Sequence, residues 1–225
     1  MKHIFTRTAA ALMAASMALS FASCSDKKDA DSHNEGNLAA GNPEAFDGVS
    51  QENLPYGATV TQLTPDIDGV PVMTEYDNRY LTAEEGTLVC NYFAGIALKD
   101  ADMFSSAVYP PYLEFRLKTL NGISTEEFVE GQYETVNKST GGDFEFTYIM
   151  ITDCLREGEF DNFSAFDNVL LDMNPDAKIT ERKYLQIDCM YNDTTNGGNY
   201  SLKNRLGGEI SLCLYTIDGK PYLLT

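Results

Sequence analysis

The sequence predicts an α+β domain in which N-terminal helices pack on a curved antiparallel sheet, preceded by a signal peptide and a disordered tether. Apolar residues recur at helical spacing through most of residues 82–140, and they alternate with polar residues in two long segments, residues 143–155 and 179–191. Asp218-Gly219, between two apolar runs, is typical of a two-residue hairpin turn. Helices that come first and strands that follow indicate an α+β arrangement.

Residues 1–23 predict an export signal, because two basic residues precede the apolar stretch 9–22 and small residues lead into Cys24. The tetrad Phe21-Ala22-Ser23-Cys24 resembles the lipobox of bacterial lipoproteins. That resemblance implies cleavage before Cys24, a diacylglyceryl group on its sulfur, and a protein anchored to the cell membrane and facing outside the cytoplasm. Two alternatives stay open. One is a membrane helix, although about 14 apolar residues fall short of the roughly 20 that a bilayer needs. The other is a secretory signal with Cys24 as a plain thiol.

The remainder of the chain divides by composition. Residues 24–50 are rich in Asp, Asn, Gly, Ser and Ala, so we expect a disordered tether, which as a flexible coil spans ~30 Å. Residues 51–80 hold two extended runs around a Pro/Asp/Gly cluster, which predicts an extended arm or hairpin. Residues 81–225 are long enough for one domain with a single core.

Four helices are expected between residues 82 and 141. The first begins at Thr82, because Thr82-Ala83-Glu84-Glu85 is a capping box, and it breaks at residues 99–102. A short helix to about Val108 follows, and a third begins after Pro110-Pro111. Ser124-Thr125-Glu126-Glu127 is a second capping box, and its helix ends at Gly141-Gly142.

Two long strands follow, separated by a helix that ends at Asn174-Pro175. In the first strand, residues 143–155, the alternation predicts one face that carries Phe144, Phe146, Tyr148, Met150 and Cys154. In the second, residues 179–191, we expect the face with Arg182, Tyr184, Gln186 and Asp188 to meet water. A loop over residues 192–208 leads to two last strands, which the Asp218-Gly219 turn connects.

With these elements in order, residues 81–225 resemble the nuclear-transport-factor-2-like superfamily, the cone-shaped fold shared with ketosteroid isomerase and scytalone dehydratase. The resemblance rests on the first helix and its acidic break, on the late run of long strands, and on the final hairpin Ile217-Asp218-Gly219-Lys220-Pro221-Tyr222-Leu223. In the first helix and break, the matching spacing is that of Tyr92, Phe93, Asp100 and Phe104. The resemblance implies a cone whose interior hosts ligands or reactions, and it transfers no catalytic residue.

Composition excludes several classes of function. The net charge of −18 at pH 7 argues against nucleic acid as a partner, because phosphate binding requires clustered Lys and Arg. The two histidines, His3 and His33, lie in the predicted signal peptide and the tether. The domain is therefore not expected to contain a His-dependent triad or a His metal ligand. No Cys-x-x-Cys pair or phosphate-binding loop is present. The sequence therefore predicts neither a metal nor a cofactor.

The domain contains four cysteines in apolar, regular segments: Cys90, Cys154, Cys189 and Cys213. We expect free, buried thiols. The alternative is a disulfide between Cys189 and Cys213 on neighbouring strands.

The function we expect is non-catalytic: a lipid-anchored protein that binds a small ligand or an envelope protein outside the cytoplasm. The expected cone would be lined by Phe93, Phe115, Tyr148 and Met150, because binding pockets are mostly apolar with a few polar groups. One alternative is an isomerase or dehydratase that uses an Asp/Tyr pair, which requires a buried carboxylate near a phenol. Another is a structural module of an envelope assembly.

Overall fold

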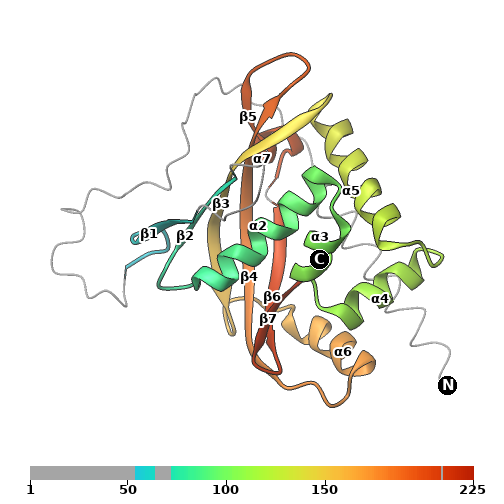
Figure 1. Cartoon of the computed structure of the whole chain (residues 1–225). Coiled ribbons are helices and arrows are strands. Elements are labelled where there is room, and N and C mark those ends of the chain that lie inside the picture. The colour runs from blue at the N-terminus through green and yellow to red at the C-terminus, as the bar shows by residue number, and fades with distance from the viewer. Residues whose placement is uncertain (1–53, 64–71, 209) are drawn as a thin grey trace.

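The structure, a computed structural model, describes residues 54–63, 72–208 and 210–225. These residues form helices and one sheet in separate layers, which confirms the α+β class (Figure 1). The helices are α2 (Ala83–Leu98), α3 (Ala101–Ala107), α4 (Pro110–Thr119), α5 (Thr125–Thr140), α6 (Phe163–Met173) and α7 (Leu202–Leu206). The strands are β1 (Val60–Leu63), β2 (Met73–Asp77), β3 (Phe144–Arg156), β4 (Ile179–Asp193), β5 (Asn199–Ser201), β6 (Ile210–Ile217) and β7 (Lys220–Leu224). The predicted signal peptide, Cys24 and the tether lie outside the described residues.

The seven strands form one open sheet in the order β1-β2-β3-β4-β6-β7, with β5 paired to β4. The expectation of a wholly antiparallel sheet is wrong, because β2 runs parallel to β3, with Met73 opposite Tyr148. β1 and β2 pair antiparallel, as expected for a hairpin. The parallel pairing makes this predicted arm part of the main sheet.

Both predicted capping boxes are confirmed, at the N-termini of α2 and α5. Thr82 Oγ1 accepts from Glu85 N at 3.2 Å, and Glu85 Oε2 accepts from Thr82 N at 2.8 Å. Ser124 and Glu127 make the same reciprocal pair in α5. Each box satisfies two backbone N–H donors at a helix N-terminus, which fixes where the helix begins.

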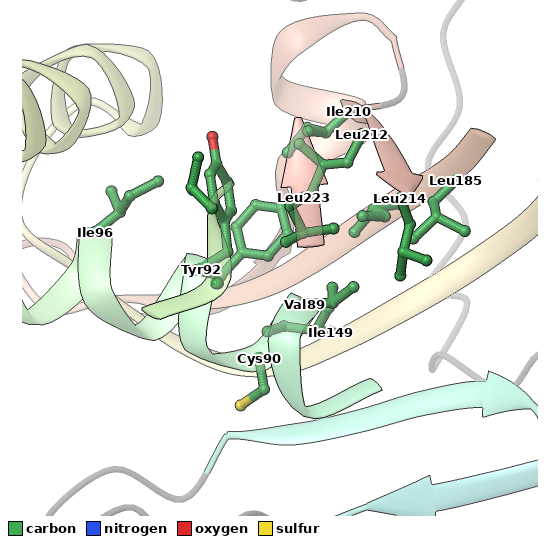
Figure 2. Packing of buried hydrophobic residues seen from close by; sticks show 14 of the residues in the cluster. Val89, Cys90, Tyr92, Ile96, Ile149, Leu185, Ile210, Leu212, Leu214 and Leu223 are labelled. Atoms are coloured by element: carbon green, nitrogen blue, oxygen red, sulfur yellow. The ribbon is translucent and has the colours of Figure 1, made fainter. Parts of the chain in front are cut away.

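The hydrophobic core lies between the sheet and α2. Figure 2 shows Val89 of α2 close to Ile149 of β3, with aliphatic side chains of β4, β6 and β7 beside them. Farther from the sheet, Phe104 of α3 packs against Phe128 of α5, with ring centroids 5.7 Å apart. The close approach of α2 and α3 requires Gly95, because a Cβ atom there would lie 2.7 Å from Phe104 N.

A β-bulge in β3 decides which side chains face α2. Phe146 lies opposite Tyr191, but Tyr148 lies opposite Met190, so the extra residue between them reverses the alternation. Phe146 therefore faces α2, whereas Tyr148 and Met150 lie on the other side of the sheet. The prediction that these three residues share a face is wrong for this reason. We call the side away from α2 the distal face.

Helix α6 covers one end of the distal face. Phe160, just before α6, stacks on Tyr184 with ring centroids 4.0 Å apart. Phe163 packs edge-on against Tyr215, and Asp167 pairs with Arg182 at 2.9 Å. The expectation that Arg182 and Tyr184 simply meet water is therefore wrong.

Residues 192–208, predicted to form a loop, contain β5 and α7. Asp188 is buried because this segment covers it. Its Oδ2 accepts from Ser201 Oγ at 2.7 Å, and its Oδ1 accepts from Lys203 N at 2.9 Å. Asp188 was also expected to meet water, and this expectation is wrong. Three- and five-residue elements produce no periodic signal in the sequence.

Two side chains at the end of β2 hold the segment that precedes β1. Asp77 accepts from Gly57 N at 2.9 Å and from Thr59 Oγ1 at 2.6 Å. Arg79 donates to the carbonyl oxygens of Leu54 and Pro55, and it pairs with Asp77 at 2.6 Å. We call this arrangement the Asp77–Arg79 clamp.

We expect the Asp77–Arg79 clamp to make the free energy of unfolding depend on pH in the acidic range. Burial alone would raise the pKa of Asp77, but hydrogen bonds from Arg79 and Thr59 and the Arg79 charge outweigh burial and lower this pKa to about 2. A depressed folded-state pKa stabilises the fold above the unfolded value, near 3.8, and this stabilisation is lost as the pH falls toward 2. The difference is worth about 2 kcal/mol.

Urea unfolding of the wild type and of Asp77→Asn between pH 2 and 6 measures this contribution. The asparagine variant should be less stable at pH 6 and should lose less stability on acidification. Parallel curves for the two proteins across this range would contradict the role given to Asp77.

Candidate functional site

The candidate site lies on the distal face, where β2, β3 and β4 run side by side. The strand register places Met73, Tyr148 and Met190 in one row across these strands. The next row holds Glu75 and Met150, and β1 adds Gln62 opposite Glu75. We call these six residues the distal cluster.

A buried carboxylate is the centre of the distal cluster. Glu75 is only 1% exposed. Its Oε2 accepts a short hydrogen bond from Tyr148 Oη and a second, of 3.2 Å, from Gln62 Nε2. Gln62 Nε2 also lies 3.1 Å from Tyr148 Oη. Buried carboxylates are held in place by such donors, so the three polar groups have fixed positions before any ligand arrives.

The electrostatics fix the direction of the phenol–carboxylate bond. Burial raises the pKa of Tyr148 well above its ordinary value, and the hydrogen bond and charge of Glu75 raise it further. Tyr148 therefore stays protonated at neutral pH, and its hydroxyl donates a hydrogen bond to Glu75. In this pair Glu75 accepts a hydrogen bond from the neutral phenol of Tyr148, and Tyr148 is not an activated phenolate.

Thioethers surround this polar centre. Met150 is buried but is not part of the core on the α2 side, while Met73 and Met190 are partly exposed. Methionine side chains are flexible and polarisable, and they adapt to the shape of an apolar partner. The distal cluster thus combines a few fixed polar groups with apolar side chains, a composition that small-molecule sites share.

The structure does not bring together the four residues expected to line a cone. Phe93 is buried on the α2 side, where its ring packs against Phe146 with centroids 5.9 Å apart. Phe115 is partly exposed on α4, whose buried positions are Tyr112, Leu113 and Arg116. Only Tyr148 and Met150 are neighbours, and both belong to the distal cluster.

Four residues of the distal cluster were not expected as site residues: Glu75, Gln62, Met73 and Met190. The first three lie in the segment predicted to form an arm outside the domain. The available signal was the alternation of Met73, Glu75 and Asp77 within an extended run. That alternation places the three side chains on one face, but it does not say which strand they pair with.

All four cysteines are buried and free, which confirms the expectation for Cys90, Cys154, Cys189 and Cys213. The alternative Cys189–Cys213 bridge is not formed. The register of β4 and β6 sets Cys213 opposite Tyr184, several residues from Cys189. Burial raises the pKa of Cys154 and Cys213 to about 12, so neither thiol is a nucleophile at neutral pH.

The described residues contain neither a candidate metal site nor a candidate membrane span. No group of three or more His, Cys, Asp or Glu side chains in this part of the chain could hold a metal ion. Within the same residues, no helix combines the length and the apolar character needed to cross a membrane.

Comparison with known proteins returns no relative. No protein-family model matches the chain, and no curated protein or solved structure is significantly similar to it.

Proposed function

We propose that this chain is a lipid-anchored protein outside the cytoplasm that binds a small ligand or a partner protein without catalysis, through the distal cluster. The single observation that supports this binding surface is the position of Glu75. Its buried carboxylate accepts hydrogen bonds from Tyr148 and Gln62 and lies beside three methionine side chains. The anchor at Cys24 rests on the lipobox-like tetrad. The membrane is thus one partner, through lipid, and the acidic composition does not support nucleic acid as another.

The chemistry of the cluster indicates what it would accept. Carboxylate oxygens attract cations and hydrogen-bond donors, and the acidic protein as a whole attracts cations. The neighbouring methionine side chains favour a ligand with a short apolar part. We therefore expect a ligand, or a side chain of a partner protein, with a cationic head and an aliphatic stem.

Methyl NMR of methionine tests this proposal directly. Butylammonium added to the full chain with labelled methyl groups should shift the signals of Met73, Met150 and Met190. Met103 on α3 and Met173 on α6 lie elsewhere and serve as internal controls. Glu75→Gln should weaken the response about tenfold or more, because a charge-assisted hydrogen bond is worth roughly 1.5–3 kcal/mol.

The matched control is Glu145→Gln, which removes an exposed carboxylate from β3, on the same side of the sheet. This variant should bind butylammonium nearly as well as the wild type. The proposal is wrong if all five methyl groups respond equally, if none responds, or if Glu145→Gln weakens binding as much as Glu75→Gln.

One observation favours an isomerase or dehydratase as a second candidate function. Such an enzyme needs a buried carboxylate next to a phenol, and Glu75 with Tyr148 is such a pair. The carboxylate is Glu rather than the expected Asp, and the pair lies on the distal face. Turnover that Tyr148→Phe abolishes without loss of binding would favour the enzyme over the binding protein.

We also propose that residues 81–225 are a divergent cone-shaped domain of the nuclear-transport-factor-2-like type. Support comes from the long α2 with its break at Lys99, from the order of helices and long strands, and from the terminal hairpin of β6 and β7. An envelope interaction module has less support, since the large apolar residues exposed within the described ranges, Leu98, Leu171 and Tyr200, lie on three different elements.

A further inference from the structure

A second cluster of polar groups lies on the other side of the sheet, around Arg116 of α4. The Arg116 side chain is buried, with 3% of the residue exposed. None of the ion pairs within the described part of the chain includes it. A positive charge is therefore enclosed in the domain without a carboxylate side chain to balance it.

The hydrogen bonds of Arg116 use only part of its guanidinium. Nη1 donates to Tyr112 Oη at 3.0 Å and to the carbonyl oxygen of Thr225. Tyr112 Oη donates to the same carbonyl oxygen. Nη2 is buried and has no hydrogen-bond partner in the structure.

A second tyrosine reaches the same place from α2. Burial raises the pKa of Tyr92, while the Arg116 charge and a hydrogen bond to Thr225 oppose the shift. Figure 2 shows the Tyr92 hydroxyl directed away from Val89 and Ile149. Two phenols and one guanidinium thus converge at the end of β7.

This arrangement is costly unless an anion completes it. A buried charge without a counter-ion opposes folding, and so does a buried N–H group without a hydrogen-bond acceptor. Guanidinium groups bind carboxylates through two parallel N–H bonds, and phenols add further donors. We propose that Arg116, Tyr92 and Tyr112 form a carboxylate-binding site on the α2 side of the sheet.

The carboxylate can come from two sources with the same chemistry. One is a small monocarboxylate taken from solution. The other is a C-terminal α-carboxylate, such as the one Thr225 carries in a chain that ends there. This site is separate from the distal cluster and does not depend on the function proposed for that cluster.

Unfolding of the purified full chain by urea, with and without butyrate, tests the proposal. Butyramide is the neutral control for shape, and sodium chloride is the control for ionic strength. The variants are Arg116→Met, which keeps an apolar stem without charge, and Arg116→Lys, which keeps the charge without the two-pronged geometry. A chain extended by two glycines after Thr225 separates the two sources.

If the site takes a ligand from solution, butyrate should raise the urea midpoint of the wild type and of the extended chain by a similar amount. Butyramide should not, Arg116→Lys should need at least tenfold more butyrate, and Arg116→Met should not respond. If the chain end fills the site, the extension should lower the midpoint of the wild type but not of Arg116→Met, and butyrate should restore it.

Two results would overturn the proposal. In the first, butyrate raises no midpoint, and Arg116→Met is as stable as the wild type or more stable, which is expected when a buried charge never acquires a counter-ion. In the second, Arg116→Met is less stable, but neither the extension nor butyrate changes any midpoint. Arg116 would then serve only through its bonds to Tyr112 and Thr225. The wild type with butyrate keeps the test valid even if a variant fails to fold.

Discussion

Replacing Lys183 with methionine is expected to lower the free energy of unfolding by about 3–5 kcal/mol. Lys183 on β4 and Glu85 on α2 form an ion pair of 2.6 Å, with side chains only 5% and 4% exposed. Methionine would fill much of the volume but leave the Glu85 carboxylate buried without its cation. That carboxylate also completes the capping box of α2, so the start of the helix would lose support.

Urea unfolding of Lys183→Met, Glu85→Gln and the double variant measures the coupling. The double variant should be less destabilised than the sum of the two single variants, because neither residue is then left buried and alone. The exposed pair Lys118–Glu114 on α4 is the matched control, with side chains 72% and 68% exposed. Lys118→Met should change stability by less than about 0.5 kcal/mol. Equal losses for Lys183→Met and Lys118→Met would show that burial does not strengthen the pair.

Replacing Cys24 with alanine is expected to move the protein from the membrane fraction to the soluble extracts of the cell. The proposed thioether is the attachment point of two acyl chains, and each buried CH₂ group contributes about 0.8 kcal/mol to membrane binding. Without them, the acidic domain has no affinity for anionic head groups. Fractionation of cells that express each protein, followed by immunoblotting, gives the measurement.

Ser25→Ala is the matched control, because it changes the neighbouring residue and keeps the thiol. It should stay with the membrane. Mass spectrometry of the mature wild-type N-terminus should show Cys24 as the first residue with an acyl mass added. A mature chain that retains its first methionine, or an alanine variant that stays in the membrane, would be incompatible with the anchor.

Local chemistry made several elements predictable from the sequence. Thr82 with Glu85, and Ser124 with Glu127, each specify a helix start within four residues, and both starts are confirmed. The turn at Asp218-Gly219 has positive φ at both residues, as a type I′ hairpin turn requires. Such signals act within one stretch of chain, so the sequence displays them directly.

Non-local features could not be predicted in the same way. The bulge after Phe146 is defined by where β4 pairs, and it moves Tyr148 and Met150 to the distal face. The parallel pairing that brings Glu75 to Tyr148 joins distant parts of the chain. The sequence therefore predicted Tyr148 and Met150 as site residues, but not that they would lie on the distal face beside Glu75.

The Asp77–Arg79 clamp has a mechanical consequence. Its bonds hold Leu54, Pro55, Gly57 and Thr59, all of which precede β1. A force that pulls on the chain ahead of Leu54 therefore acts first on the hydrogen bonds of Asp77 and Arg79. The backbone hydrogen bonds between β1 and β2 come under force only after the bonds of the clamp have broken. Pulling on this end of the domain is therefore expected to open the clamp before it separates the two strands.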